Sequence, residues 1–274
     1  AERVHKALPG STLYAAAKYQ GLVEGAVYFE EPIKELLPKT WPLHDGHVFV
    51  MASGIVLRAL APLILDKRVD PAVLVVDLKG RYFVPLLAGH LGGANPLARH
   101  LAEALGGEAV LTTGTDSLGA PAPDLLAKAL GARVPDWKPL KEVSALLVDG
   151  RPVGFWSDCV DLSPLLRYPM VRLLEAPEAE GVEGMVLFTV RQPFPLPVPT
   201  LFAHPPALVL GIGCNRGTPL EEMRREVFGF LQERGFARES LRVLATAELK
   251  RDEAGLLAFA EETGLPLRFH PKEV

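Results

Sequence analysis

The stretch that decides the fold extends from residue 82 to residue 105 and has the sequence YFVPLL-AGHLGGAN-PLARHLAEAL. An apolar run, a glycine-rich turn and an amphipathic run follow one another, which predicts a strand, a tight turn and a helix. We expect Asn95 to cap the helix and Pro96 to take its first position. Glycines let a backbone approach a ligand closely, and a helix start offers unpaired N–H donors with a partial positive charge. Because His90 in the same turn can exchange a proton near neutral pH, the turn predicts a site for anion binding and proton transfer.

Strand and helix patterns alternate around this turn. Upstream, an apolar run at 48–53 predicts a strand, and apolar residues at helical spacing over 55–65 predict a helix. The runs at 72–76 and 82–87 are separated by a short turn, which predicts a β-hairpin. Alternating strands and helices predict an α/β fold, with a three-layer α/β domain and its hairpin over residues 1–135.

The rest of the chain predicts two further domains. Residues 136–205 alternate short apolar runs, such as 145–148, with glycine and proline, which predicts a small strand-rich middle domain. Its end, residues 191–206, is rich in proline and is expected to be an extended linker. Residues 206–274 show the order βαβαβ, typical of a C-terminal α/β domain. Because no closing helix follows the third strand, we expect this domain to be a partial one.

Composition excludes several classes of protein. The chain has 274 residues, of which 49% are hydrophobic and 23% charged, so we expect packed domains rather than disorder. A net charge of −4 gives no basic footprint for nucleic acid. No apolar run reaches about 18 residues and no signal peptide pattern is seen, so we expect no membrane span and a cytoplasmic location, which the two cysteines also suit. Abundant Leu, Ala, Arg, Glu and Pro with few Asn and Gln favour a thermophilic source.

Polar side chains near the glycine turn are further candidates. Thr113, Thr115 and Asp116 follow a short predicted strand, where they can orient a polar substrate or a histidine. They can equally form an Asx or ST turn. Arg58 and Lys67 can bind carboxylates, or can remain solvated surface charges.

A second glycine turn, residues 211–218, lies between a predicted strand and a predicted helix. It resembles a dinucleotide fingerprint but has three residues rather than two before its last glycine. No acidic residue ends the next strand where a ribose would need one. The nucleotide interpretation is therefore weak, and an anion-binding turn with Arg216 as a charged contact remains open.

Several catalytic and metal signatures are absent from the sequence. There is no Gly-x-Ser-x-Gly elbow, no His-Glu-x-x-His and no P-loop, which disfavours serine hydrolases, zincins and P-loop kinases. Residues 44–47 hold two histidines and one aspartate, a poor zinc signature that we expect in a loop leading into a strand. We therefore expect no metal site.

The same residues carry a resemblance to a known family. The chain resembles the CbiG family of cobalamin biosynthesis proteins over residues 48–116 and 208–270, and the middle region matches it by position. The matching strings lie at 54–58, 61–62, 66–67, 70–73, 75–77, 80, 87, 89–95, 112–113, 115–116, 211–218, 245–246 and 249–253.

The resemblance implies a hydrolase acting on carbon–carbon bonds in the anaerobic cobalamin pathway. Water opens the ring-A δ-lactone of cobalt-precorrin-5A, acetaldehyde leaves and cobalt-precorrin-5B forms. The cobalt belongs to the tetrapyrrole substrate, so no cofactor or protein-bound metal is expected. We hypothesise that His90 with Asp116 activates water and that the N–H groups of Gly92 and Gly93 stabilise the oxyanion. The predicted substrate-binding residues are Arg58, Lys67, Gly92, Gly93, Asn95, Thr113, Thr115, Gly213, Arg216, Thr218 and Lys250.

Two other functions remain open at this point. The partial C-terminal domain favours a non-catalytic protein that binds or carries a tetrapyrrole intermediate. The turn at 211–217 alone suggests a nucleotide-binding oxidoreductase or transferase. Beyond the tetrapyrrole, neighbouring precorrin methyltransferases are candidate partners, and a homodimer is one oligomeric state compatible with the sequence.

Overall fold

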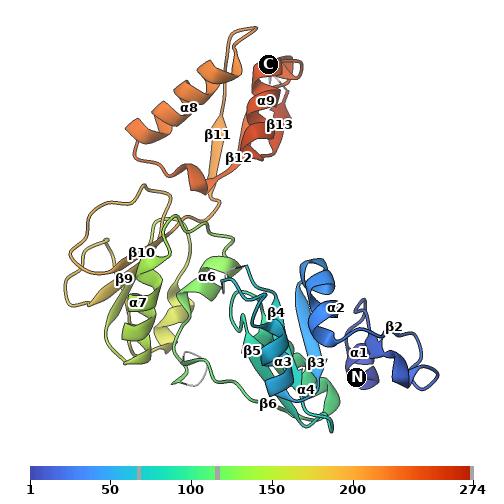
Figure 1. The fold of residues 1–274 in the computed structure, drawn as a ribbon. Coiled ribbons are helices and arrows are strands. Elements are labelled where there is room, and N and C mark those ends of the chain that lie inside the picture. Colours follow the sequence, from blue (N-terminus) through green and yellow to red (C-terminus); the bar gives the residue numbers. More distant parts are fainter. Residues whose placement is uncertain (67–68, 115–117, 272–274) are drawn as a thin grey trace. The chain divides into compact units, whose positions relative to one another are not determined.

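The computed structural model describes residues 1–66, 69–114 and 118–271 of the chain (Figure 1). The predicted site residues Lys67, Thr115 and Asp116 lie outside these described residues. The chain divides into two compact units, Ala1–Ser117 and Leu118–Val274. Within the described residues, no helix has the length and apolar character needed to cross a membrane.

The first unit is built on a mixed four-stranded sheet. Its strands are β3 (Gly46–Val50), β4 (Ala72–Val76), β5 (Tyr82–Leu87) and β6 (Glu108–Ala109), in that spatial order. β3 and β4 are parallel, β4 and β5 are antiparallel, and β5 and β6 are parallel. The antiparallel pair confirms the predicted hairpin. In this topology the ends of β5 and β6 lie at the same edge as the starts of β3 and β4. A separate parallel pair consists of β1 (Tyr14–Ala16) and β2 (Val27–Phe29).

Helices cover both faces of the four-stranded sheet. Leu74 and Val76 of β4 share a core with α1 (Glu2–Ala7) and α4 (Ala94–Leu105). Val73 and Val75 share a second core with α2 (Ile33–Thr40) and α3 (Ser53–Leu60). Successive side chains of a strand point to opposite faces, so these two cores lie on the two sides of β4. The predicted three-layer α/β arrangement is therefore confirmed.

Two predicted helix boundaries are wrong. α4 begins at Ala94 and not at Pro96, and its cap is Gly93, whose φ is +89°. Only glycine adopts that left-handed conformation readily, so the chain turns into the helix at Gly93 and Asn95 is drawn inside it. α3 covers Ser53–Leu60 rather than residues 55–65, because Pro62 cannot continue a helix.

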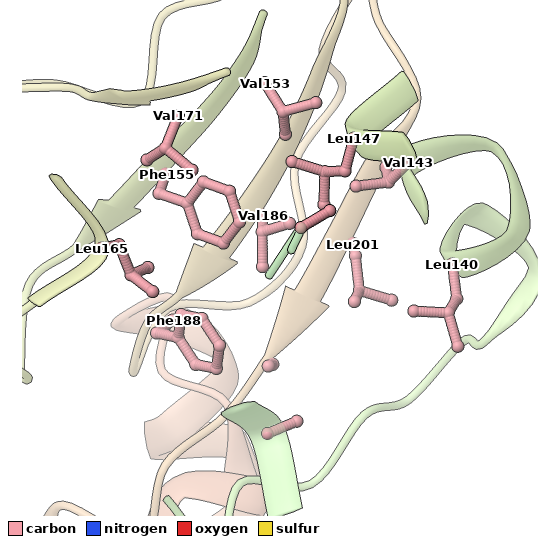
Figure 2. Close-up of a cluster of buried hydrophobic side chains, with 13 residues drawn as sticks. Leu140, Val143, Leu147, Val153, Phe155, Leu165, Val171, Val186, Phe188 and Leu201 are labelled. Carbon is pink, nitrogen blue, oxygen red and sulfur yellow. The ribbon is translucent and has the colours of Figure 1, made fainter. Parts of the chain in front are cut away.

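The middle part of the second unit is a parallel sheet. Its strands are β7 (Val153–Ser157), β8 (Val171–Leu173), β9 (Gly184–Phe188) and β10 (Thr200–Ala203), and they lie in the order β10-β9-β7-β8. The helices α6 (Pro123–Ala129) and α7 (Lys138–Val148) contribute to the same core. Figure 2 shows that core, to which α7 contributes Leu140, Val143 and Leu147 and the sheet contributes Val153, Phe155 and Val186.

Two predictions for this region are corrected. Residues 145–148 belong to α7 and not to a strand, because their apolar positions complete one helical face. The predicted linker at 191–206 contains β10, which pairs with β9 along its whole length. Prolines flank this segment, but Thr200–Ala203 has none and can therefore make a full set of ladder hydrogen bonds.

The last part of the chain confirms the predicted βαβαβ order. Its elements are β11 (Leu208–Gly211), α8 (Leu220–Glu233), β12 (Leu241–Ala247), α9 (Ala254–Thr263) and β13 (Leu267–His270). The three strands are parallel, with β12 in the centre, and both helices share one core with them. The turns after β11 and β12 therefore lie at one edge of this sheet. Short 3-10 helices occur at Ala17–Tyr19, Trp41–Leu43, Ser163–Arg167, Arg238–Ser240 and Glu248–Lys250.

Candidate functional site

The glycine turn between β5 and α4 is closed by its own backbone hydrogen bonds. The N–H of Gly93 donates to the carbonyl oxygen of His90 at 3.0 Å. The next two N–H groups, at the start of α4, donate to carbonyl oxygens of the turn at 3.2 and 3.0 Å. Donors that a helix start usually leaves open are thus satisfied locally. Within residues 1–66, 69–114 and 118–271 no backbone acceptor is seen for the N–H of Gly92, so a ligand can use this donor.

Close packing explains why the turn needs glycine at two further positions. A Cβ on Gly89 would lie 2.7 Å from Oδ1 of Asn95. A Cβ on Gly92 would lie 2.3 Å from the Cβ of Ala88. The half-buried His90 therefore sits on a backbone that has little room to move.

Asn95 joins this turn to the segment that follows β6. Its side chain is 4% exposed, and Nδ2 donates to Oγ1 of Thr113 at 2.7 Å. Since β5 and β6 are parallel, their carboxyl ends meet at one edge, where this contact forms. The structure thus brings together His90, Gly92, Gly93, Asn95 and Thr113, all of which the sequence predicts as site residues.

Replacing Asn95 by alanine is expected to reduce the free energy of unfolding of the first unit by about 0.5–1.5 kcal/mol, because the hydrogen bond from the buried Asn95 amide to Oγ1 of Thr113 is lost. Hydrogen exchange of the α4 amides measures this change. Thr113→Val removes the other partner and is the matched control. The double variant should cost less than the sum of the single ones, and strictly additive costs would contradict a direct interaction.

The second glycine turn connects β11 to α8. It contains the predicted substrate-binding residues Gly213, Arg216 and Thr218, of which the first two are exposed and the third is half-buried. Gly213 is exposed, and the hydroxyl of Thr218 donates to the carbonyl oxygen of Asn215 at 2.9 Å. The guanidinium of Arg216 lies 2.8 Å from a carboxylate oxygen of Asp252, and this contact lowers the pKa of that carboxyl. Both side chains are largely exposed, so a ligand carboxylate can compete with Asp252 for the guanidinium.

A buried acid, Glu253, lies behind this turn. It is 4% exposed and precedes α9 directly. One carboxylate oxygen accepts the N–H of Gly217 at 2.7 Å, and the other lies 3.6 Å from Nζ of Lys250. The carboxylate of Glu253 therefore already accepts the N–H of Gly217, a donor that a nucleotide phosphate bound at this turn would need. This contact argues against the nucleotide-binding alternative.

Comparison with known proteins assigns these regions to one family. Residues 35–116 match the description "Cobalamin synthesis G N-terminal", residues 121–205 "Cobalamin biosynthesis central region" and residues 208–274 "Cobalamin synthesis G C-terminus". This chain belongs to the CbiG family.

Relatives within the CbiG family include named hydrolases. The cobalt-precorrin-5A hydrolase of Salmonella typhimurium is 33% identical over 255 residues, which cover 89% of this chain and 71% of the relative. The cobalt-precorrin-5A hydrolase of Priestia megaterium is 32% identical over 259 residues, covering 90% and 69%. A crystal structure described as a cobalamin biosynthesis protein G homologue from Sulfolobus solfataricus has 21% identity and a TM-score of 0.40, and the match covers 94% of this chain and 79% of that one.

Arg58 of this CbiG-family chain makes a local contact. Its guanidinium donates to the carbonyl oxygen of Gly54 at 3.2 Å, one turn back along α3, and the side chain is exposed. The charge is thus directed along its own helix.

The histidines at 44 and 47 pack with aromatic rings at the start of β3. His47 stacks on Trp41 with ring centroids 5.0 Å apart, and Tyr14 bonds His44 through its hydroxyl at 3.3 Å. Burial lowers the pKa of His47, so its imidazole is neutral at physiological pH. Within the described ranges, no group of three or more His, Cys, Asp or Glu side chains could hold a metal ion. We interpret this pair as part of the packing of the first unit.

Glu253 is the residue that sequence reasoning missed in this CbiG-family site. It lies in the matching string at 249–253, but its partner Gly217 is 36 positions away. Only the pairing of β11 with β12 brings the two loops together. A pattern of local spacing cannot reveal that contact.

Proposed function

We propose that this chain is a cobalt-precorrin-5A hydrolase that opens the ring-A δ-lactone, gives cobalt-precorrin-5B and releases acetaldehyde. The observation that carries the proposal is the 33% identity to a named cobalt-precorrin-5A hydrolase over 89% of this chain. The cobalt is a part of the substrate, and the protein needs no resident cofactor for this reaction.

In the proposed mechanism, His90 removes a proton from the attacking water. The water oxygen bonds to the lactone carbonyl carbon, and the carbonyl oxygen becomes an oxyanion that accepts the N–H of Gly92. Collapse of this intermediate restores the carbonyl and breaks the ring C–O bond, which leaves a carboxyl group and an alkoxide. The alkoxide oxygen forms the carbonyl of acetaldehyde as its carbon separates from the macrocycle, and the macrocycle takes the electron pair and the proton held by His90. Gly93 has a structural role in the proposal, because its left-handed conformation shapes the turn. Its N–H donates to the carbonyl oxygen of His90 and is therefore not offered to the oxyanion. Asp116 keeps its proposed role of orienting His90.

Peripheral carboxylates of the tetrapyrrole are the proposed ligands of the cationic and polar residues. Arg216 supports this proposal best, because its present partner Asp252 is exposed and can be exchanged. The other proposed contacts are Arg58, Lys67, Asn95, Thr113, Thr115, Gly213, Thr218 and Lys250. A cytoplasmic location, partnership with precorrin methyltransferases and a homodimer remain predictions.

Anaerobic incubation with cobalt-precorrin-5A, with acetaldehyde trapped as it forms, tests the proposal. We expect acetaldehyde in many-fold excess over protein, and none with heat-denatured protein. If the tetrapyrrole binds and no acetaldehyde forms, the hydrolase proposal fails and the carrier alternative is favoured.

A further inference from the structure

The buried carboxylate of Glu253 connects the two turns at the carboxyl edge of the last sheet. It accepts the N–H of Gly217 from the turn after β11 and lies beside the ammonium group of Lys250 from the turn after β12. The Glu253 side chain is 5% exposed and that of Lys250 is 21% exposed. An anion buried to this degree needs a cation or hydrogen-bond donors close to it, and these two groups supply them.

Backbone packing holds the same two segments together. The Cα of Gly255 in α9 approaches the carbonyl oxygen of Thr218 so closely that a Cβ there would lie 2.0 Å from it. The turn after β11 is therefore pressed against the start of α9 and is also bonded to it through Glu253. Its conformation depends on contacts made by residues 253–255.

The position of Lys250 depends on the same acid. An ammonium group has three donors, and that of Lys250 lies 3.6 Å from a carboxylate oxygen of Glu253. The Lys250 side chain is 21% exposed, so a group outside the protein can approach it. A lysine loses much rotamer freedom when it binds a ligand, and a side chain already held by an internal partner loses less.

We propose that Glu253 is a positioning residue. It holds the second glycine turn, residues 211–218, and the ammonium group of Lys250 in place for an anionic group of the ligand, and it does not touch the ligand itself. This inference rests on the proposed function in one respect, namely that Lys250 binds a substrate carboxylate. It adds a residue whose role is to orient that contact.

Glu253→Gln tests the proposal in the full chain. Glutamine keeps an oxygen that can accept the Gly217 N–H but loses the charge that holds Lys250. Fluorescence titration with uroporphyrin, a polycarboxylate tetrapyrrole, should show binding weakened by about tenfold. Glu262→Gln is the matched control, because Glu262 is an acid near the end of α9, the helix that Glu253 precedes, and is paired with Arg224. The affinity of this control should stay within about twofold. With cobalt-precorrin-5A the Glu253 variant should raise KM and leave kcat nearly unchanged.

The outcomes separate this proposal from the hydrolase proposal. Wild-type affinity of Glu253→Gln for uroporphyrin overturns the positioning role, whatever the acetaldehyde assay gives. A wild-type chain that releases no acetaldehyde, together with weakened uroporphyrin binding in the variant, overturns the hydrolase proposal alone. Lys250→Met tests whether the effect of Glu253→Gln is purely structural. In a double variant with Glu253→Gln the two losses should overlap, and independent losses would contradict the proposal.

Discussion

His90→Ala is expected to lower kcat for acetaldehyde release by about 10²–10⁴-fold, the usual contribution of a positioned general base. The fold should survive the change. The bond that closes the glycine turn uses the backbone carbonyl of His90, which alanine retains. The side chain is half-buried at the surface of the turn, so its removal opens no large cavity. Stopped assays with trapped acetaldehyde measure the rate, and circular dichroism with a thermal melt checks the fold.

His100→Ala is the matched control for this experiment. His100 lies on α4, is exposed, and reaches the carbonyl oxygen of Ala7 at 3.4 Å. Loss of this histidine should change neither the rate nor the melting temperature by much. Turnover at the wild-type rate in His90→Ala would remove His90 from the mechanism, and the glycine turn would then be a structural feature.

Local patterns were enough to predict the elements that carry the first site. The alternation of apolar runs and glycines predicts β5, the turn and α4, because each of these elements is determined by neighbours in the chain. The boundary of α4 was missed because Asn95 looks like a cap in sequence. Its side chain is instead buried against Thr113, a partner 18 positions away in the segment that follows β6. Tertiary contact thus overrides the capping preference.

Charge was the property that sequence predicted least well. Arg216 and Lys250 are recognisable as cations that can bind carboxylates, and the sequence gives no sign that each already has an acid as its partner. The two pairs differ in burial. Asp252 is exposed and replaceable, whereas Glu253 is buried and fixed. The difference in burial depends on how α9 packs. A ligand can displace the exposed Asp252 from Arg216, whereas the buried Glu253 stays in place beside Lys250.

Gly255→Ala is expected to destabilise the last part of the chain by about 2–3 kcal/mol. The new Cβ would lie 2.0 Å from the carbonyl oxygen of Thr218 and 3.4 Å from the carbonyl carbon of Pro219, so backbone must move on one side or the other. Gly229→Ala is the matched control, because Gly229 lies inside α8 with nothing within 4 Å of the added Cβ. Alanine favours a helix over glycine by about 1 kcal/mol, so this control should gain stability while Gly255→Ala loses it. Hydrogen exchange of β12 and α8 amides measures both changes in stability.

The same substitution should also affect ligand binding. Since the backbone that must move is the turn that ends at Thr218, Gly255→Ala should weaken uroporphyrin binding, and Gly229→Ala should not. Equal stability gains in the two variants would mean that α9 does not press on this turn, and the role inferred for Glu253 would lose its structural basis.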